Sequence, residues 1–221
     1  MNTVYKFRRT FFTHRTVITM KKIAVYGGSF DPPHKGHKTL AENLAEACGA
    51  EKVIIIPAHS SPFKNGCCAS DTDRLEMCRL AFCDSFFEVS NTEINRGGKS
   101  YTYDTLCELK KLYPDSVIYL FMGDDMFLSL DRWYRHNDLL KLCIPVAACR
   151  TEDKRCFDEM KKYAENVLGL QKNEYIISSE KPFEISSSEI RKLIKENDAF
   201  SDYVDKKFYD FIISRGLYNE K

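Results

Sequence analysis

The sequence lacks long apolar runs and an excess of charge of either sign. Its 221 residues include 33 basic and 32 acidic side chains. The longest apolar segments, Val53–Ile56 and Val117–Met122, are only as long as a buried strand, which excludes a transmembrane helix. Proteins that bind the nucleic-acid backbone normally carry a basic excess, so the balanced charge argues against that class. We therefore expect neither a membrane nor a nucleic acid as a partner.

The sequence also lacks the cysteine spacings of a metal site. It contains nine cysteines, an odd number that excludes a complete set of internal disulfides, and it has no C-x-x-C pair. Cys107, Cys143 and Cys149 lie in apolar stretches, where a reduced thiol is a small buried hydrophobic group. We expect a reducing compartment, the cytoplasm, and no metal ion held by the protein itself.

The composition and the N-terminus predict one domain with an extension. With 43% hydrophobic and 13% aromatic residues, the chain can bury one core and is too aromatic to be disordered. Residues 1–19 contain four basic and no acidic side chains, and lack the apolar core of a signal peptide. Met20, followed by two lysines and an apolar strand, resembles a natural start. We predict that 1–19 are an N-terminal extension, disordered or upstream of a mis-called start codon, and that 20–221 are a single domain.

Apolar strands alternate with amphipathic helices along the rest of the chain. Strands are expected at 23–26, 53–56, 86–89, 117–122, 144–149 and 175–178. Helices are expected at 37–48, 71–84, 102–112, 153–168, 187–196 and 202–214, with short helices across 125–141; Asp71 or Thr72 is expected to cap the second helix and Ser100 or Thr102 to open the third. Strands that are apolar throughout are buried on both faces. The predicted fold is α/β, a Rossmann-like doubly wound parallel sheet with helices on both faces and a small C-terminal helical segment.

The turn after the first strand combines glycines with two histidines. It reads G-G-S-F-D-P-P-H-K-G-H from Gly27 to His37. Glycines let backbone N–H groups approach an anion, and the helix N-terminus that follows adds a partial positive charge. His34 and His37 share one helix face and can both contact one phosphate, although spacing alone also allows a chance pair. The turn matches neither G-x-G-x-x-G nor G-x-x-x-x-G-K-[ST], which argues against a dinucleotide oxidoreductase and an ordinary kinase.

Two separated motifs resemble one enzyme superfamily. The H-x-G-H formed by His34–His37 resembles the signature of nucleotidyltransferases that transfer AMP or CMP from a nucleoside triphosphate. The segment Ile185–Arg191, I-S-S-S-E-I-R, resembles their I-S-S-T-x-I-R motif, with Ser188 in place of threonine. Serine hydroxyls at this position can cap a helix, and the planar guanidinium of Arg191 is suited to bind the oxygens of a polyphosphate.

Three further segments resemble bacterial-type nicotinate-nucleotide adenylyltransferases. Glu93–Leu106 is similar to E-x-x-R-x-G-x-S-Y-T-x-D-T-L, Gly123–Trp133 to G-x-D-x(4)-L-x(2)-W, and Phe211–Tyr218 to Y-I-x(3)-G-L-Y. The resemblance extends from about Met20 to Tyr218. The chain departs from the family at Phe63, where the family more often has His before the lysine, and by lacking a proline near 202–204.

The resemblance implies an enzyme of NAD biosynthesis. It would join ATP and nicotinate mononucleotide into nicotinate adenine dinucleotide and pyrophosphate, by in-line attack of the mononucleotide 5′-phosphate on the α-phosphorus of ATP. One alternative is an adenylyl- or cytidylyltransferase of the same fold that takes nicotinamide mononucleotide or phosphopantetheine. Another is a non-catalytic nucleotide-binding module, which would have no need of His37 or Arg191. A homo-oligomer is compatible with the sequence, which does not determine the oligomeric state.

The site residues follow from the matched motifs. His37 is the predicted catalytic residue, supported by His34 and Arg191. The predicted ATP-binding residues are Gly28, Ser29, Phe30, His34, His37, Ser186, Ser187, Ser188 and Arg191. The predicted residues for the mononucleotide are Lys64, Tyr101, Thr102, Asp125, Trp133 and Tyr134. Mg²⁺ is expected to be carried mainly by the ATP phosphates and water, as is common for this hard cation on nucleotides.

Overall fold

Six parallel strands form the centre of the molecule. The computed structural model describes residues 20–63, 66–149, 154–179 and 185–219. The strands are β1 (Lys22–Gly28), β2 (Lys52–Pro57), β3 (Phe87–Val89), β4 (Val117–Gly123), β5 (Ile144–Cys149) and β6 (Ile176–Ser179). Their order in the sheet is β3-β2-β1-β4-β5-β6, and every neighbouring pair is parallel. The connections run outward in both directions from the pair β1 and β4, so the loops after these two strands diverge and leave a crevice between them.

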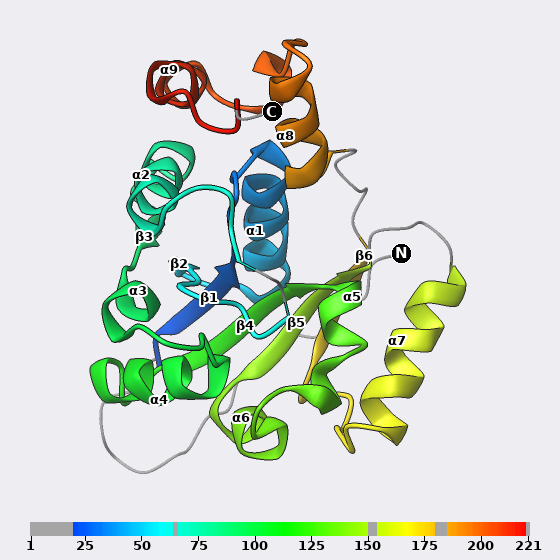
Figure 1. The fold of residues 1–221 in the computed structure, drawn as a ribbon. Coiled ribbons are helices and arrows are strands. Elements are labelled where there is room, and N and C mark those ends of the chain that lie inside the picture. The colour runs from blue at the N-terminus through cyan, green and yellow to red at the C-terminus, as the bar shows by residue number, and fades with distance from the viewer. Residues whose placement is uncertain (1–19, 64–65, 150–153, 180–184, 220–221) are drawn as a thin grey trace.

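Helices cover both faces of this sheet (Figure 1). The described helices are α1 (Lys35–Cys48), α2 (Asp71–Ala81), α3 (Thr92–Arg96), α4 (Thr102–Leu112), α5 (Asp124–Phe127), α6 (His136–Leu142), α7 (Lys154–Asn166), α8 (Ser187–Lys195) and α9 (Lys206–Arg215). Alternate residues of β1 enter opposite cores, because successive side chains of a strand point to opposite faces. Ile23 and Val25 pack with α4, α6 and α7, whereas Ala24 and Tyr26 pack with α1 and α2. The predicted Rossmann-like fold is confirmed.

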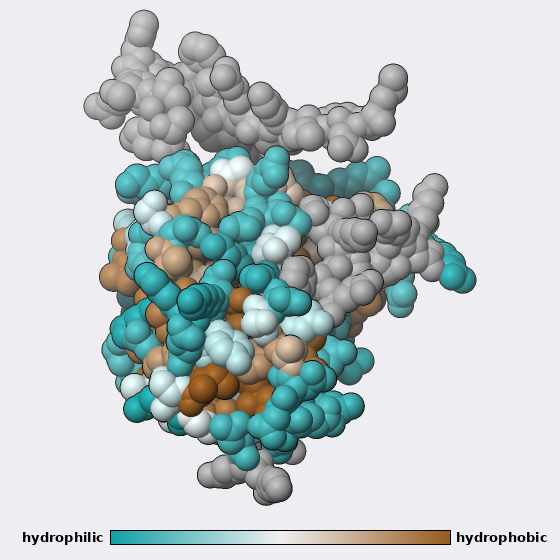
Figure 2. Space-filling view, turned by 90° about the horizontal axis from the view of Figure 1, so that it is seen from above, coloured by the Kyte–Doolittle hydropathy of each residue, from teal (hydrophilic) through white to brown (hydrophobic). Residues whose placement is uncertain are grey.

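A third apolar cluster forms the predicted C-terminal helical segment. It joins α8 and α9 to α2, through buried residues that include Met77, Ile190, Phe208 and Ile212. In Figure 1, α8 and α9 lie at the top of the view, next to the upper ends of α1 and α2. Seen from that side in Figure 2, most of the coloured surface is hydrophilic and the hydrophobic residues form small groups. The packing of this segment places the second motif beside the first.

Several element boundaries differ from the sequence prediction. Helix α1 begins at Lys35 rather than 37, so that His34 is its N-cap residue. Helix α2 is capped by Ser70, whose Oγ accepts a hydrogen bond from the Asp73 amide, and not by Asp71 or Thr72. Tyr101 precedes the first turn of α4, so Ser100 does not open that helix. Cap positions depend on backbone geometry that composition alone does not reveal.

The prediction also missed one helix and misplaced several helix ends. Helix α3 has only five residues and is too short to show a helical period. Helix α2 ends at Ala81 instead of Asp84, and α9 begins at Lys206, after a 3₁₀ turn at Ser201–Tyr203, instead of at 202. A second 3₁₀ turn occupies Leu130–Arg132. Among the described helices, none is long and apolar enough to cross a membrane.

Candidate functional site

A cleft of about 560 Å³ opens where β1, β2 and β4 end. This is the crevice expected at the carboxyl edge of an open parallel sheet. All but one of the predicted site residues line it: Gly28, Ser29, Phe30, His34, His37, Tyr101, Thr102, Asp125, Trp133, Tyr134, Ser186, Ser187, Ser188 and Arg191. The exception, Lys64, lies outside the described residues.

The two histidines lie against each other at the start of α1. Their ring centroids are 3.8 Å apart, and the His34 amide donates to His37 Nδ1 at 3.2 Å. Because Nδ1 accepts this bond, a neutral His37 ring carries its proton on Nε2. His34 is buried, whereas His37 is half-buried and lines the cleft. The backbone of the first turn thus orients His37 as a hydrogen-bond donor.

The loop between β1 and His34 has a constrained backbone. Phe30 has a φ of 47°, a left-handed conformation that is unfavourable for a side chain of this size. The residue is 2% exposed, and its ring packs edge-on against Tyr26, His37 and Phe82. A Cβ at Gly28 would lie 3.1 Å from this ring, closer than ordinary van der Waals contact, so a side chain there would press against Phe30. The Phe30 side chain therefore belongs to the core, and its backbone is the part available to a phosphate.

The second motif is hydrogen-bonded directly to the first loop. Arg191 Nη1 donates to the Asp31 carbonyl at 2.6 Å, and Ser187 Oγ donates to the Pro32 carbonyl at 2.8 Å. Arg191 Nη2 also donates to Ser188 Oγ at 3.1 Å. Residues about 160 positions apart are therefore neighbours. Two regions of the sequence that resemble phosphate-binding motifs line one cleft together.

Ser186 has a defined local role at the start of α8. Its Oγ accepts a hydrogen bond from the Glu189 amide at 3.2 Å, and Glu189 Oε2 accepts one from the Ser186 amide at 2.7 Å. This reciprocal pair is a capping box, which fixes the orientation of the first helical turn. The hydrogen bonds from Ser186 lower the pKa of Glu189 below its usual value. The capping box sets the orientation of the turn that carries Ser187, Ser188 and Arg191.

Aromatic side chains form the other end of the cleft. The rings of Tyr101 and Tyr134 have centroids 4.5 Å apart, and those of Phe63 and Trp133 are 5.8 Å apart. Trp133 packs partly against the core, and its Nε1 is buried without a hydrogen-bond partner among the described residues. Asp125 is exposed in the first turn of α5, where Gly123 is the N-cap residue. Asp125 therefore does not cap that helix.

A buried carboxylate supports the turn before α4. Glu93 lines the cleft, is 6% exposed, and accepts a hydrogen bond of 2.6 Å from Thr105 Oγ1. Burial raises its pKa above the usual value. Arg96 donates to the same Thr105 oxygen at 2.9 Å and to Glu108 at 2.8 Å. Glu93 and Arg96 belong to the motif Glu93–Leu106, but the sequence does not reveal their role. In the structure both side chains contact Thr105 Oγ1 and so hold the start of α4 in place.

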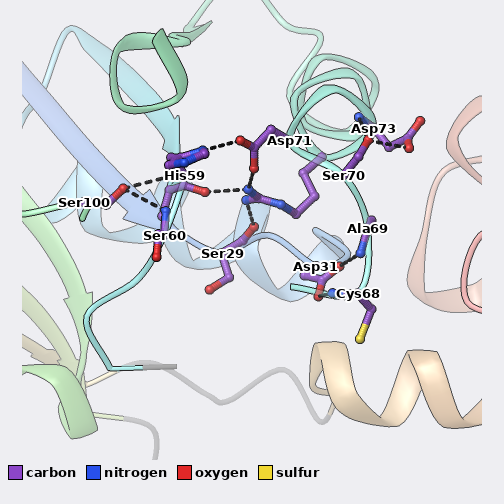
Figure 3. Close-up of polar contacts among 12 residues, drawn as sticks. Ser29, Asp31, His59, Ser60, Cys68, Ala69, Ser70, Asp71, Asp73 and Ser100 are labelled. Carbon is purple, nitrogen blue, oxygen red and sulfur yellow. Dashed lines mark hydrogen bonds and ion pairs between the residues drawn. The ribbon is translucent and has the colours of Figure 1, made fainter. Parts of the chain in front are cut away.

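Asp31 is another site residue without a role predicted from the sequence. Its carboxylate accepts hydrogen bonds from the amides of Cys68 and Ala69, at 2.7 and 3.1 Å (Figure 3). It also accepts one from the Tyr218 hydroxyl at 2.8 Å. Asp31 thus joins the first loop to the segment before α2 and to the end of the chain. No local pattern marks this convergence, because the partners are up to 187 positions away.

The described residues provide no cluster of three or more His, Cys, Asp or Glu side chains arranged to hold a metal ion. None of the nine cysteines, all within the described residues, forms a disulfide. Cys143 and Cys149 are buried as expected, whereas Cys107 is only half-buried. Burial raises the pKa of the Cys143 thiol to about 12, which makes it unreactive. The buried thiols contribute packing at their sites.

Comparison with known proteins identifies the family. Residues 25–193 match the cytidylyltransferase-like family model. The chain is 38% identical to the probable nicotinate-nucleotide adenylyltransferase of Carboxydothermus hydrogenoformans, over 89% of this chain and 98% of the relative. It is 37% identical to the protein of that name from Fusobacterium nucleatum, over 84% and 94%.

Solved structures agree on the fold. The nicotinic acid mononucleotide adenylyltransferase of Plasmodium falciparum complexed with NaAD has a TM-score of 0.69 at 20% identity, over 91% of this chain and 98% of that one. A putative nicotinate-nucleotide adenylyltransferase from Vibrio parahaemolyticus has a TM-score of 0.60 at 21% identity, over the same shares. By its sequence motifs, its cleft and its curated relatives, the chain belongs to the nicotinate-nucleotide adenylyltransferases of the cytidylyltransferase-like family.

Proposed function

We propose that this enzyme transfers the adenylyl group of ATP to nicotinate mononucleotide, forming nicotinate adenine dinucleotide and pyrophosphate in NAD biosynthesis. One observation carries the proposal: the motifs His34–His37 and Ile185–Arg191, which resemble phosphate-binding segments, line the same cleft as Trp133. Tyr101 and Thr102 line it too, and the family resemblance assigns these three residues to the pyridine mononucleotide. Nucleotide and acceptor can thus be bound side by side at one sheet edge. The family membership of the chain agrees with this activity.

The reaction needs no nucleophile from the protein. The 5′-phosphate of the mononucleotide is already anionic, so one of its oxygens attacks the α-phosphorus while the bond to the β-phosphate oxygen breaks. The protein contributes positioning and stabilisation of the charge that develops on the α-phosphate and on pyrophosphate. His37 is proposed to donate from Nε2 to the α-phosphate, supported by His34, Ser29 and the backbone from Gly28 to Phe30.

The β- and γ-phosphates are assigned to α8. Arg191, Ser187 and Ser188 line the cleft, and the capping box at Ser186 fixes their turn. The Asp31 carbonyl and Ser188 hold the guanidinium of Arg191 at the cleft wall. A planar guanidinium binds phosphate oxygens with two parallel hydrogen bonds. Such bonds would stabilise the negative charge that pyrophosphate gains as it leaves.

The mononucleotide is assigned to the aromatic end of the cleft. The indole face of Trp133 is proposed to stack on the pyridine ring. Backbone N–H groups at Thr102, the first residue of α4, and at Tyr134 would meet the nicotinate carboxylate. A negative charge is favoured at a helix N-terminus, which supports the acid over the amide. Asp125 is assigned to the substrate or ribose neighbourhood, and Lys64 to the substrate phosphate.

A divalent cation fits the reaction, which consumes ATP. Mg²⁺ would be held mainly by ATP oxygens and water, as is common for this hard cation on nucleotides. When bound, it would neutralise charge on the phosphates. We also infer that residues 20–221 act as one catalytic domain in the cytoplasm, where the nine cysteine thiols would remain reduced.

A coupled pyrophosphate-release assay tests the activity. The purified chain is given ATP and Mg²⁺ with nicotinate mononucleotide, nicotinamide mononucleotide or phosphopantetheine. We expect the highest kcat/KM with the acid mononucleotide and slower release with the amide. Release only with phosphopantetheine would support the alternative transferase. An absence of release with every acceptor would contradict the proposed function.

A further inference from the structure

A buried guanidinium lies beneath the cleft, outside the family motifs recognised in the sequence. Arg74, in the first turn of α2, is fully buried, with 0% of its surface exposed. Burial of a cation is costly unless its hydrogen-bonding groups have well-placed partners. Two of the partners of Arg74 are main-chain carbonyls of loops that line the cleft, which indicates a role beyond stabilising α2.

The two ends of the guanidinium hold two different loops. Nη1 donates to the Ser29 carbonyl at 2.7 Å, and Nη2 donates to the Ala58 carbonyl at 2.6 Å. Ser29 belongs to the nucleotide loop after β1, and Ala58 directly follows β2. Nη2 also pairs with Asp71, whose second carboxylate oxygen contacts His59 Nδ1 (Figure 3). One side chain therefore links the ends of two neighbouring strands.

The link continues to the turn before α4. The carbonyl of the Ala58–His59 peptide binds Arg74, and the amide of the same peptide donates to Ser100 Oγ at 3.0 Å. The Ser100 amide in turn donates to the Ser60 carbonyl at 2.9 Å. Figure 3 shows Ser29, His59 and Ser100 arranged along this line. A continuous chain of hydrogen bonds thus runs from the nucleotide loop to the turn that carries Tyr101 and Thr102.

We propose that Arg74 is a positioning residue that sets the separation between the nucleotide loop and the acceptor turn. The inference rests on the proposed function, in which each of these segments binds one substrate. In-line attack requires the attacking oxygen within about 3–3.5 Å of the phosphorus, and a displacement of about 1 Å can cost about 100-fold in rate. The left-handed backbone of Phe30, next to Ser29, also needs restraint by its surroundings.

The conservative variant Arg74→Lys provides the first test. Lysine keeps the charge, but its compact ammonium group lacks the planar fork that spans both carbonyls. We expect kcat to fall about 30- to 100-fold, the scale of a misplaced reacting pair. The dissociation constants of ATP alone and of nicotinate mononucleotide alone, measured by calorimetry, should stay within about threefold, since each substrate keeps its own loop.

The matched control is Arg79→Lys on the same helix. Arg79 is exposed and pairs with Glu76, so its variant should retain the wild-type kcat. A kcat of Arg74→Lys within about twofold of wild type would overturn the proposal. A second result would also overturn it. If kcat and the number of substrate-binding sites per protein molecule fell by the same factor, Arg74 would only keep the protein folded.

A second variant acts at the other end of the chain of hydrogen bonds. Ser100→Ala removes the acceptor shared by the His59 and Ser60 amides and leaves Arg74 paired. We expect the same pattern, with a fall in kcat of about 5- to 10-fold, the scale of one or two lost hydrogen bonds, and little change in the two dissociation constants. This variant also serves if Arg74→Lys fails to fold, and an unchanged kcat in it would overturn the proposed link.

Hydrogen exchange separates failure of this inference from failure of the proposed function. If the wild-type enzyme shows no turnover with any acceptor, the proposed function fails. Amide exchange over residues 27–31 and 57–60 then tests Arg74 independently. We expect at least about tenfold faster exchange in both segments of Arg74→Lys, because local opening becomes easier. Unchanged exchange in either segment would show that Arg74 does not hold the two loops together.

Discussion

His37 illustrates how one residue's chemistry depends on its neighbours. The amide of His34 donates to Nδ1 of the His37 ring, which directs the proton of the neutral ring to Nε2. The ring also lies edge-on to Phe30, with centroids 5.2 Å apart, so its orientation is restricted. A restrained donor needs little rearrangement as charge develops on a phosphate.

His37→Ala is expected to lower kcat by about 10²- to 10⁴-fold, the range for removing one preorganised donor or acid–base group. Steady-state kinetics with saturating ATP and nicotinate mononucleotide measure this effect. His136→Ala is the control, since His136 does not line the cleft, and it should keep the wild-type turnover. A His37→Ala enzyme as fast as wild type would remove His37 from the mechanism.

Trp133→Leu is expected to raise the KM for nicotinate mononucleotide roughly 10-fold, the upper range for loss of an aromatic stack. The KM for ATP should remain unchanged, because Trp133 lies at the acceptor end of the cleft. Trp133→Phe keeps an aromatic face and should lose less. Equal increases in both KM values would indicate that Trp133 only packs against the core.

At the scale of elements, the N-terminus of α2 is tied to α9. Asp73 Oδ2 accepts from Ser70 Oγ at 2.7 Å, while Oδ1 accepts from Arg215 Nη2 at 2.7 Å. These hydrogen bonds lower the pKa of Asp73 below its ordinary value of 3.8. A lowered folded-state pKa contributes stability above the unfolded-state pKa, and this contribution is lost as the pH falls through the folded-state pKa.

Asp73→Asn is therefore expected to destabilise the protein at neutral pH by about 1 kcal/mol, a value that allows for the solvent exposure of Arg215. The difference from wild type should shrink as the pH falls below the ordinary Asp value. Urea unfolding of both proteins across this acid range measures it. A pH-independent difference would mean that the ionised form of Asp73 makes no special contribution.

At the scale of the whole molecule, the topology places the chemistry. Strands β1 and β4 are adjacent, and their following segments belong to opposite faces of the sheet. The cleft forms at this point, and α8 reaches it from the C-terminal segment through the contacts of Ser187 and Arg191. One cleft is therefore assembled from segments across most of the described chain.

Removal of residues 1–19 is expected to leave kcat and both KM values within about twofold of the full chain, since these residues carry none of the family motifs and the matched region begins at residue 25. Parallel kinetics on the full-length and shortened proteins provide the comparison. A large loss of activity in a folded, shortened protein would assign the extension to the catalytic unit.

The sequence by itself determined the sheet, the order of its main elements and the location of the motifs. Apolar strands and amphipathic periods are local patterns, and the motif residues are adjacent or nearly so in the chain. Only the tertiary structure decided that Ser70 caps α2, that Glu93 supports the acceptor turn and that Asp31 bonds to Tyr218. It likewise decided that Arg74 joins the Ser29 and Ala58 carbonyls. These contacts depend on which groups meet after folding. The partners Glu93 and Thr105, or Asp31 and Tyr218, become neighbours only in the folded chain, and a main-chain carbonyl such as those bound by Arg74 carries no signature in the sequence.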